Sequence, residues 1–395
     1  MDSLVDTKRE AFKLNSNYFM LVLLCFGALF IKNPKLFGIA ITDISIVIGI
    51  VIALTYSYTA KAKTSNIFLL SIVLLFMLYG VIGLFKVPDK IIFLKYYARW
   101  LKSFAVGVLG YTFFRRLDEK LQLKIIKFFF YLAVVTIVLD TVYSLYYFST
   151  KDTVNVWVLY GSLKVSYLYA DKNMVAFTIS LLMVISYRFL HKKYLFLLWF
   201  LTIISLSRSG ILINTFILFS YLGFKLIKPS VLIVLASTIL FTVAIVYALD
   251  LSQMFADRLS LNKDLSMQGR IGLQRMGINM WLAAPLTGQG LSGYEQYFFS
   301  FFEGGEQNPF PHNLYIYILA ELGLVGVLFF SIIFYLLWRK LHKNQLGMLI
   351  WVYLLFGMFL FNLSEYHFFF LVGVLLAYKR NSEQLENRIF SSIPC

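Results

Sequence analysis

Residues 250–312 form a long polar interval in a chain that otherwise reads as one apolar segment after another. The centre of the interval reads Gln268-Gly-Arg-Ile-Gly-Leu-Gln-Arg-Met-Gly-Ile-Asn-Met-Trp281, and then Pro285-Leu-Thr-Gly-Gln-Gly-Leu-Ser-Gly293. It ends at Pro309-Phe-Pro-His312, where a new apolar segment begins. A long loop on a bundle of helices is a common place for a functional site, so we expect the chemistry of this protein there.

The composition of the whole chain indicates a membrane protein. Of the 395 residues, 60% are hydrophobic and only 14% are charged, and a single water-soluble core could not bury so many apolar side chains. The formal net charge of +16 would suggest nucleic-acid binding in a soluble protein. Here most Lys and Arg residues lie in short connections between apolar segments, where they set orientation, so we expect a lipid bilayer and no nucleic acid as partner.

Apolar runs of membrane-spanning length predict an all-α polytopic fold with about twelve transmembrane helices. Residues 1–249 would hold about nine of them, and residues 313–395 about three more with a cytoplasmic C-terminal tail. Between these parts, the interval 250–312 would form one large loop with an amphipathic helix. The predicted spans are 17–31, 38–58, 66–85, 91–114, 125–148, 174–190, 194–206, 209–226, 231–249, 313–338, 346–361 and 367–378.

The distribution of Lys and Arg predicts the orientation of these helices. If the N-terminus is cytoplasmic, the connections on its side carry far more Lys and Arg than the short connections on the other side. An excess of Lys and Arg marks the cytoplasmic side. We therefore expect both termini inside and the loop 250–312 outside.

Three arginines near this outer face could bind an anion. Arg208 stands in Ser205-Leu-Ser-Arg-Ser-Gly210, a short turn between two predicted spans, and Arg270 and Arg275 lie on the predicted amphipathic helix. A guanidinium group suits phosphate because it can donate two parallel hydrogen bonds. This helix is expected to lie on the bilayer surface. The alternative is that Arg208 anchors a helix end and that the other two arginines only touch lipid headgroups.

The predicted span 91–114 carries three cations on one helical face: Lys95, Arg99 and Lys102. Charges within a span are costly and normally face a cavity or a partner. Asp43 and Asp140, each inside another predicted span, could join them in a buried ion-pair network. Three cations against two carboxylates would leave an excess of positive charge for an anionic ligand.

His312 precedes a predicted helix that begins at Asn313. A helix N-terminus disfavours imidazolium, so we expect a neutral imidazole that can accept a proton. A purely structural role of a single histidine stays open. Glu321, farther along the same helix, is expected to be a buried partner of one of the cations. No group of His, Cys, Asp and Glu in the sequence resembles a metal site.

Taken together, these motifs resemble the O-antigen ligase/polymerase superfamily. The resemblance is strongest over residues 169–338, and it implies a C-type membrane glycosyltransferase without metal or other cofactor. It also implies a bacterial inner membrane with a periplasmic active site. The motifs are Tyr169-Ala-Asp-Lys-Asn173, Ser-Arg208-Ser-Gly, Gly-Arg270, Pro285-Leu-Thr-Gly-Gln-Gly290, His312-Asn313 and Glu321-Leu-Gly-Leu-Val-Gly326.

The resemblance also implies the substrates and the roles of several residues. Such enzymes take a glycan from undecaprenyl diphosphate and pass it to a sugar hydroxyl, either on a carrier-linked repeat unit (polymerases) or on the lipid A core (ligases). Arg208 and Arg270 match the family arginines assigned to the diphosphate, and His312 matches the histidine proposed to activate the acceptor. The expected substrate-binding set also includes Arg275, Lys95, Arg99, Lys102 and Asn313.

Phe310 stands where many ligases have a second histidine, which favours a polymerase over a ligase. A chain-length regulator protein could accompany such a polymerase. From another class, a flippase for carrier-linked glycans would also use a cationic cavity, but a transporter should carry charges along both halves of its path. The unexplained cations here gather on the outer side, so a flippase is the least favoured of the three functions.

Overall fold

The computed structural model describes residues 17–26, 35–36, 39–55, 64–150, 172–205, 207–222, 265–301, 311–342, 344–359 and 365–378. These residues are almost entirely helical, as predicted. The departure is a small antiparallel pair of strands, β1 (Lys35–Leu36) and β2 (Ile39–Ala40). The predicted span 231–249, the loop segments 250–264 and 302–310, and the motif residues 169–171 lie outside the described residues.

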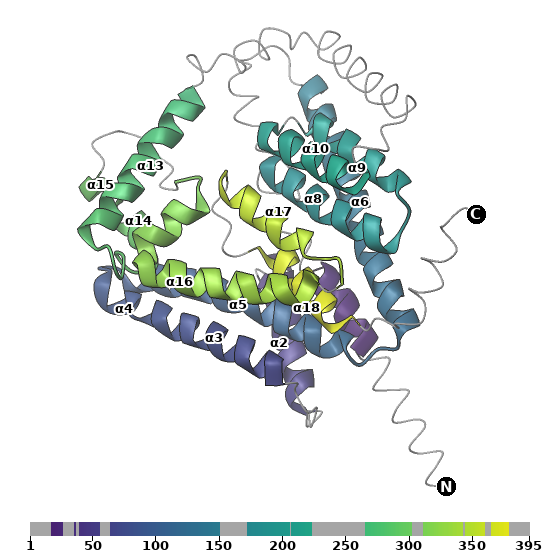
Figure 1. Ribbon diagram of the computed structural model, residues 1–395, viewed down its shortest axis with the longest axis horizontal. Helices are drawn as coiled ribbons and strands as arrows, with labels where there is room; N and C mark the ends of the chain where they lie inside the picture. Colours follow the sequence, from purple (N-terminus) through teal and green to yellow (C-terminus); the bar gives the residue numbers. More distant parts are fainter. Residues whose placement is uncertain are drawn as a thin grey trace.

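The helices follow the predicted apolar runs closely (Figure 1). After a first helix at Asn17–Phe26, the helices before the polar interval are α2 (Ile41–Thr55), α3 (Thr64–Val81), α4 (Gly83–Lys86), α5 (Lys90–Phe114), α6 (Glu119–Thr150), α8 (Lys172–Phe189), α9 (Lys193–Ile204) and α10 (Arg208–Leu222). The interval itself contains α13 (Leu265–Ala283), α14 (Gly293–Gln296) and α15 (Phe298–Phe301). They are followed by α16 (Leu314–His342), α17 (Met348–Gly357) and α18 (Tyr366–Ala377).

Within the described residues, three helical stretches are long and apolar enough to cross a membrane: Phe68–Lys86, Glu119–Val142 and Leu314–His342. Several shorter apolar helices accompany them, including α8, α17 and α18. Large apolar side chains such as Phe85 and Leu212 are exposed on the surface, where a bilayer would cover them. These features suit a membrane protein, and the count of about twelve spans stays a prediction.

Helix α18 lies at the centre of the helix bundle. It is buried over nearly its whole length and crosses α5 so closely that a Cβ atom on Gly373 would lie 2.0 Å from the carbonyl oxygen of Gly107. Small residues at a crossing let two membrane helices approach with their backbones almost in contact. On another side, Phe370 packs against Phe129 of α6, with ring centroids 5.6 Å apart.

Helix α16 is broken in its first third by the glycine-rich segment of the polar interval. Gly323 has φ 63° and ψ −162°, which no helical residue adopts. Backbone groups freed by such a break need new partners, and the segment 284–290 supplies them. The hydrogen bonds run from Gln289 N to Ala320 O (2.8 Å), Gly290 N to Glu321 O (2.8 Å), Leu324 N to Pro285 O (3.0 Å) and Val325 N to Leu286 O (3.1 Å).

This docking explains why glycine stands at two positions of the motif. A Cβ atom on Gly288 would lie 2.3 Å from the carbonyl carbon of Glu321, and one on Gly323 would lie 2.5 Å from that of Leu286. Both glycines also have positive φ. Lys86 holds the other side of the segment, because its Nζ donates to the carbonyl oxygen of Gly288 at 2.7 Å.

Gly288→Ala should therefore destabilise the protein. The added methyl group meets backbone that cannot move aside, and the positive φ adds strain, so we expect a loss of about 2–3 kcal/mol. The measurement is the thermal unfolding midpoint of purified protein in detergent. Gly80→Ala is the matched control, because a Cβ atom there would lie 3.6 Å from the Tyr97 ring in ordinary contact. Equal midpoints for the two variants would contradict the docking explanation.

Candidate functional site

The ends of several helices meet at one end of the bundle and bring polar residues together. They are the N-termini of α8, α10, α16 and α18 and the C-terminus of α17. We call the polar residues there, namely Asn173, Ser207–Ser209, His312–Asn313 and Glu365–His367, the helix-end cluster. The connecting contacts are hydrogen bonds Ser207–Asn173 (2.7 Å), Thr178–His367 (3.3 Å) and Asn313–Met358 (3.4 Å), and the Phe177–Phe356 ring contact (5.3 Å).

Arg208 is the first residue of α10, and its side chain is exposed. Ser207, the residue before it, caps the helix by accepting a hydrogen bond from the backbone N–H of Gly210 at 3.1 Å. The N-terminal end of a helix attracts anions because its backbone N–H groups point outward. An exposed guanidinium on this first turn can therefore bind an anion such as phosphate together with the helix end.

His312 and Asn313 lead into α16 with an unusual backbone. His312 is partly exposed and has φ 47°, a left-handed conformation that is uncommon for residues other than glycine and that is found at functional sites. The side-chain oxygen of Asn313 caps the helix by accepting from the N–H groups of Tyr315 (3.0 Å) and Ile316 (3.2 Å). Asn313 thus has a structural task, and its predicted contact with substrate stays a prediction.

Arg270 and Arg275 lie on α13, which forms a helix as predicted. Arg275 is exposed and Arg270 is partly buried. The apolar face of this helix, with Leu273, Met276 and Met280, packs against α14, α15 and α16, which Figure 1 shows gathered at one end of α16. These three side chains are buried by protein, whereas Ile271, Ile278 and Leu282 of the same helix are exposed. That this helix lies on the bilayer surface stays a prediction.

The three cations of α5 have different surroundings. Lys102 forms an ion pair with Asp43, with Nζ and Oδ1 2.6 Å apart and both side chains about one-third exposed. Arg99 is exposed and stacks its guanidinium over the Tyr96 ring at 5.3 Å, and Lys95 is exposed as well. The predicted pairing with Asp43 is confirmed for Lys102. Asp140, the other predicted partner, is buried in α6.

One contact links the cationic face of α5 to the helix-end cluster. Tyr366, at the start of α18, lies close enough to interact electrostatically with Asp43, Arg99 and Glu365. The structure therefore brings Arg99 toward the same end of the bundle as Glu365. Among the described residues, no group of three His, Cys, Asp or Glu side chains could hold a metal ion.

Glu321 has a different environment from the one predicted. It is buried, and its Oε1 accepts a hydrogen bond from the backbone N–H of Tyr294 at 3.2 Å. Tyr317, one turn earlier on the same helix, lies close enough to interact with the carboxyl group, and no Lys or Arg of the described residues forms an ion pair with it. The predicted ion pair is thus wrong within the described part of the chain, because the carboxyl group instead accepts a hydrogen bond from the first turn of α14.

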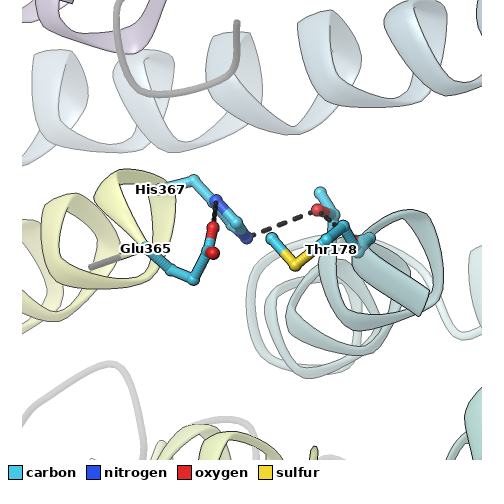
Figure 2. Close-up of polar contacts among 4 residues, drawn as sticks. Thr178, Glu365 and His367 are labelled. Atoms are coloured by element: carbon cyan, nitrogen blue, oxygen red, sulfur yellow. Dashed lines mark hydrogen bonds and ion pairs between the residues drawn. The ribbon is translucent and has the colours of Figure 1, made fainter. Parts of the chain in front are cut away.

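Glu365 and His367 form a pair that the sequence did not predict, with the histidine buried and the carboxyl group 13% exposed (Figure 2). His367 is 1% exposed; its Nε2 lies 3.3 Å from the hydroxyl of Thr178 and its Nδ1 lies 3.6 Å from Glu365 Oε2. Thr178 donates its single proton to the carbonyl oxygen of Met174 at 2.9 Å. The hydroxyl must therefore accept from His367, so Nε2 carries the proton of the imidazole.

This tautomer leaves the basic Nδ1 of His367 facing the carboxyl group of Glu365. A charged carboxylate opposite a nitrogen lone pair would be repelled, whereas a protonated carboxyl group can donate to it. Burial also raises the pKa of Glu365, to about 8, because the charged form loses its hydration. At 3.6 Å the two groups are too far apart for a hydrogen bond, so Nδ1 of His367 is a buried polar atom without a hydrogen-bond partner among the described residues.

One comparison with known proteins bears on this site. Residues 194–331 match a family model described as O-antigen ligase. The matched stretch includes Arg208, Arg270, Arg275 and His312, whereas the cationic face of α5 precedes it. A search of curated proteins found no match to the chain.

The capping role of Asn313 can be separated from any contact with substrate. Asn313→Ala removes the cap of α16 and should cost about 1 kcal/mol of stability, whereas Asn313→Asp keeps an oxygen for the two N–H groups and should stay near wild type. Thermal unfolding of the purified variants checks both expectations. If the alanine variant were as stable as wild type, the cap would contribute nothing to stability.

Proposed function

We propose that this protein is an O-antigen or related polysaccharide polymerase, because residues 194–331 match the O-antigen ligase family and so support membership of the O-antigen ligase/polymerase superfamily. It would be a metal-independent glycosyltransferase of the bacterial inner membrane that joins undecaprenyl-diphosphate-linked repeat units on the periplasmic side. Family members are glycosyltransferase-like enzymes acting on lipid-linked glycans in a membrane, so the general class follows from the match.

The observation that supports the proposal is that the helices which begin at Arg208 and just after His312, α10 and α16, both pack against α17. The group that leaves in this reaction is a polyprenyl diphosphate, which is stable as an anion. Positive charge on the phosphates therefore lowers the barrier more than a general acid would. Arg208, supported by Arg270 and Arg275 on α13, supplies that charge.

His312 is the proposed general base. The acceptor hydroxyl oxygen forms a bond to the anomeric carbon of the donor while the bond from that carbon to the diphosphate oxygen breaks. The hydroxyl proton passes to His312, and the electron pair of the broken bond leaves with the diphosphate. The partly exposed imidazole and its strained backbone suit a residue that is held ready for substrate rather than packed into the core.

The exposed cations of α5 favour the polymerase over the ligase. In polymerisation both the donor and the acceptor carry a diphosphate, so two cationic regions are useful. Arg99 and Lys95 form a second exposed cationic region, on a helix that the family match does not cover. Phe310, in the place of a second histidine, points the same way.

Two alternatives use the same residues differently. In a ligase the helix-end cluster would bind the same donor, and the acceptor would be the lipid A core. In a flippase the cations would guide the diphosphate across the membrane without chemistry. A chain-length regulator is a further partner that only the polymerase would need.

Reconstitution with defined substrates distinguishes these functions. Purified protein in nanodiscs is incubated with carrier-linked repeat units alone, and in parallel with lipid A core added. We expect oligomers linked to the carrier in the first reaction, and the same yield when EDTA is present. Transfer only to lipid A core would identify a ligase, and movement of the carrier lipid without any new glycosidic bond would identify a flippase.

His312→Ala tests the assignment of the base. The loss of a general base usually lowers a rate by about 10² to 10⁴, so we expect that decrease in polymer formation with near-normal binding of undecaprenyl diphosphate. His191→Ala is the control, because His191 is exposed in the turn between α8 and α9. If His312→Ala lowered thermal stability and donor binding together with the rate, the residue would be structural.

A further inference from the structure

Arg208 is flanked by two serines that bond to the same buried side chain. Ser207 donates its hydroxyl proton to Asn173 Oδ1 at 2.7 Å, and Ser209 lies at 3.5 Å from the same oxygen. Asn173 is near the N-terminus of α8 and is only 6% exposed, and Ser207 is fully buried. The turn that carries Arg208 is therefore tied to a different helix on both sides of the arginine.

Ser207 also fixes the first turn of α10 itself. Its single proton goes to Asn173, and its oxygen accepts from the N–H of Gly210 at 3.1 Å. Because both bonds use one hydroxyl, the orientation of the cap depends on Asn173. Gly210 lets α10 approach α8 closely, because a Cβ atom there would lie 2.3 Å from Cβ of Ala176 on α8.

We propose that Asn173 is a positioning residue that, through Ser207 and Ser209, directs Arg208 toward the diphosphate of the donor. This inference rests on the proposed function, in which Arg208 binds that diphosphate. Asn173 does not need to touch the substrate. It fixes the backbone from which the arginine side chain extends, so that less conformational freedom is lost when the guanidinium binds.

Asn214 provides a matched control within the same helix pair. It is fully buried on α10, its Nδ2 donates to Thr202 at 2.8 Å, and its Oδ1 accepts from Ser180 of α8. It follows Arg208 by six residues, roughly 9 Å along the helix axis. A variant at Asn214 therefore disturbs the same interface between α8, α9 and α10 without touching the turn at Arg208.

The experiment measures binding of undecaprenyl diphosphate to full-length protein in nanodiscs. The variants are Asn173→Ala, Ser207→Ala, Arg208→Ala, Asn173→Ala with Arg208→Ala, and Asn214→Ala. Hydrogen exchange of the backbone amides of residues 207–211 is measured on the same samples. The exchange reports on the turn whether or not the diphosphate binds there.

We expect Asn173→Ala and Ser207→Ala each to weaken binding by about tenfold, which corresponds to the loss of one hydrogen bond. Exchange at residues 207–211 should become faster. In the Arg208→Ala background, Asn173→Ala should cause no further loss, because the two residues act through one contact. Asn214→Ala should lower thermal stability but leave the affinity for undecaprenyl diphosphate unchanged.

Two results would overturn the positioning role of Asn173. One is unchanged hydrogen exchange at residues 207–211 in Asn173→Ala. The other is that Asn173→Ala weakens binding of undecaprenyl diphosphate tenfold both in wild type and in the Arg208→Ala background. A third result concerns the proposed function alone. If Arg208→Ala binds undecaprenyl diphosphate as tightly as wild type while Asn173→Ala still speeds exchange, Asn173 positions the turn but Arg208 is not the diphosphate ligand.

Discussion

The architecture of this protein depends on the backbone hydrogen bonds between the segment 284–290 and the break in α16 at Gly323. An interrupted helix in a membrane protein leaves N–H and C=O groups that lipid cannot satisfy. Here another part of the chain satisfies them, and Tyr79 of α3 adds a hydrogen bond to the carbonyl oxygen of Leu322 at 2.8 Å. The segment 284–290 of the polar interval is therefore joined to the bundle by backbone hydrogen bonds.

This junction explains how residues far apart in the sequence reach one site. The part of α16 before Gly323 packs against α13, so His312 at its start and Arg270 and Arg275 on α13 belong to one packed unit. Helix α17 contacts both α16 and α8, and so connects that unit to Arg208. The proposed base and the proposed diphosphate ligands are thus held by packed helices, which is what catalysis by positioning and charge requires.

Helices were predictable from the sequence because each apolar run has a clear beginning and end, as α5 and α8 illustrate. The exposed cations at Arg208, Arg99 and Lys95 were also predictable, since a charge at the end of an apolar run or within it avoids lipid by facing water or a polar group. The hydrogen-bond partners of the buried polar groups could not be predicted from the sequence. Glu321 bonds to a turn in the loop and not to a cation, and Asn173 reaches Ser207 across thirty-four positions. A Glu-x-His spacing marks Glu365 and His367, but only their burial distinguishes them from surface residues.

The close crossing of α18 and α5 has a consequence for the order in which the protein is made. Helix α18 is synthesised long after α5, yet it fills the centre of the bundle and contributes His367 to the helix-end cluster. Until α18 is made, the side chains that it covers on α5, α6 and α8, namely Phe104, Phe129 and Thr178, lack this partner. The hydrogen bond between Thr178 and His367 can therefore form only after nearly the whole chain has been made, although α8 itself is complete much earlier.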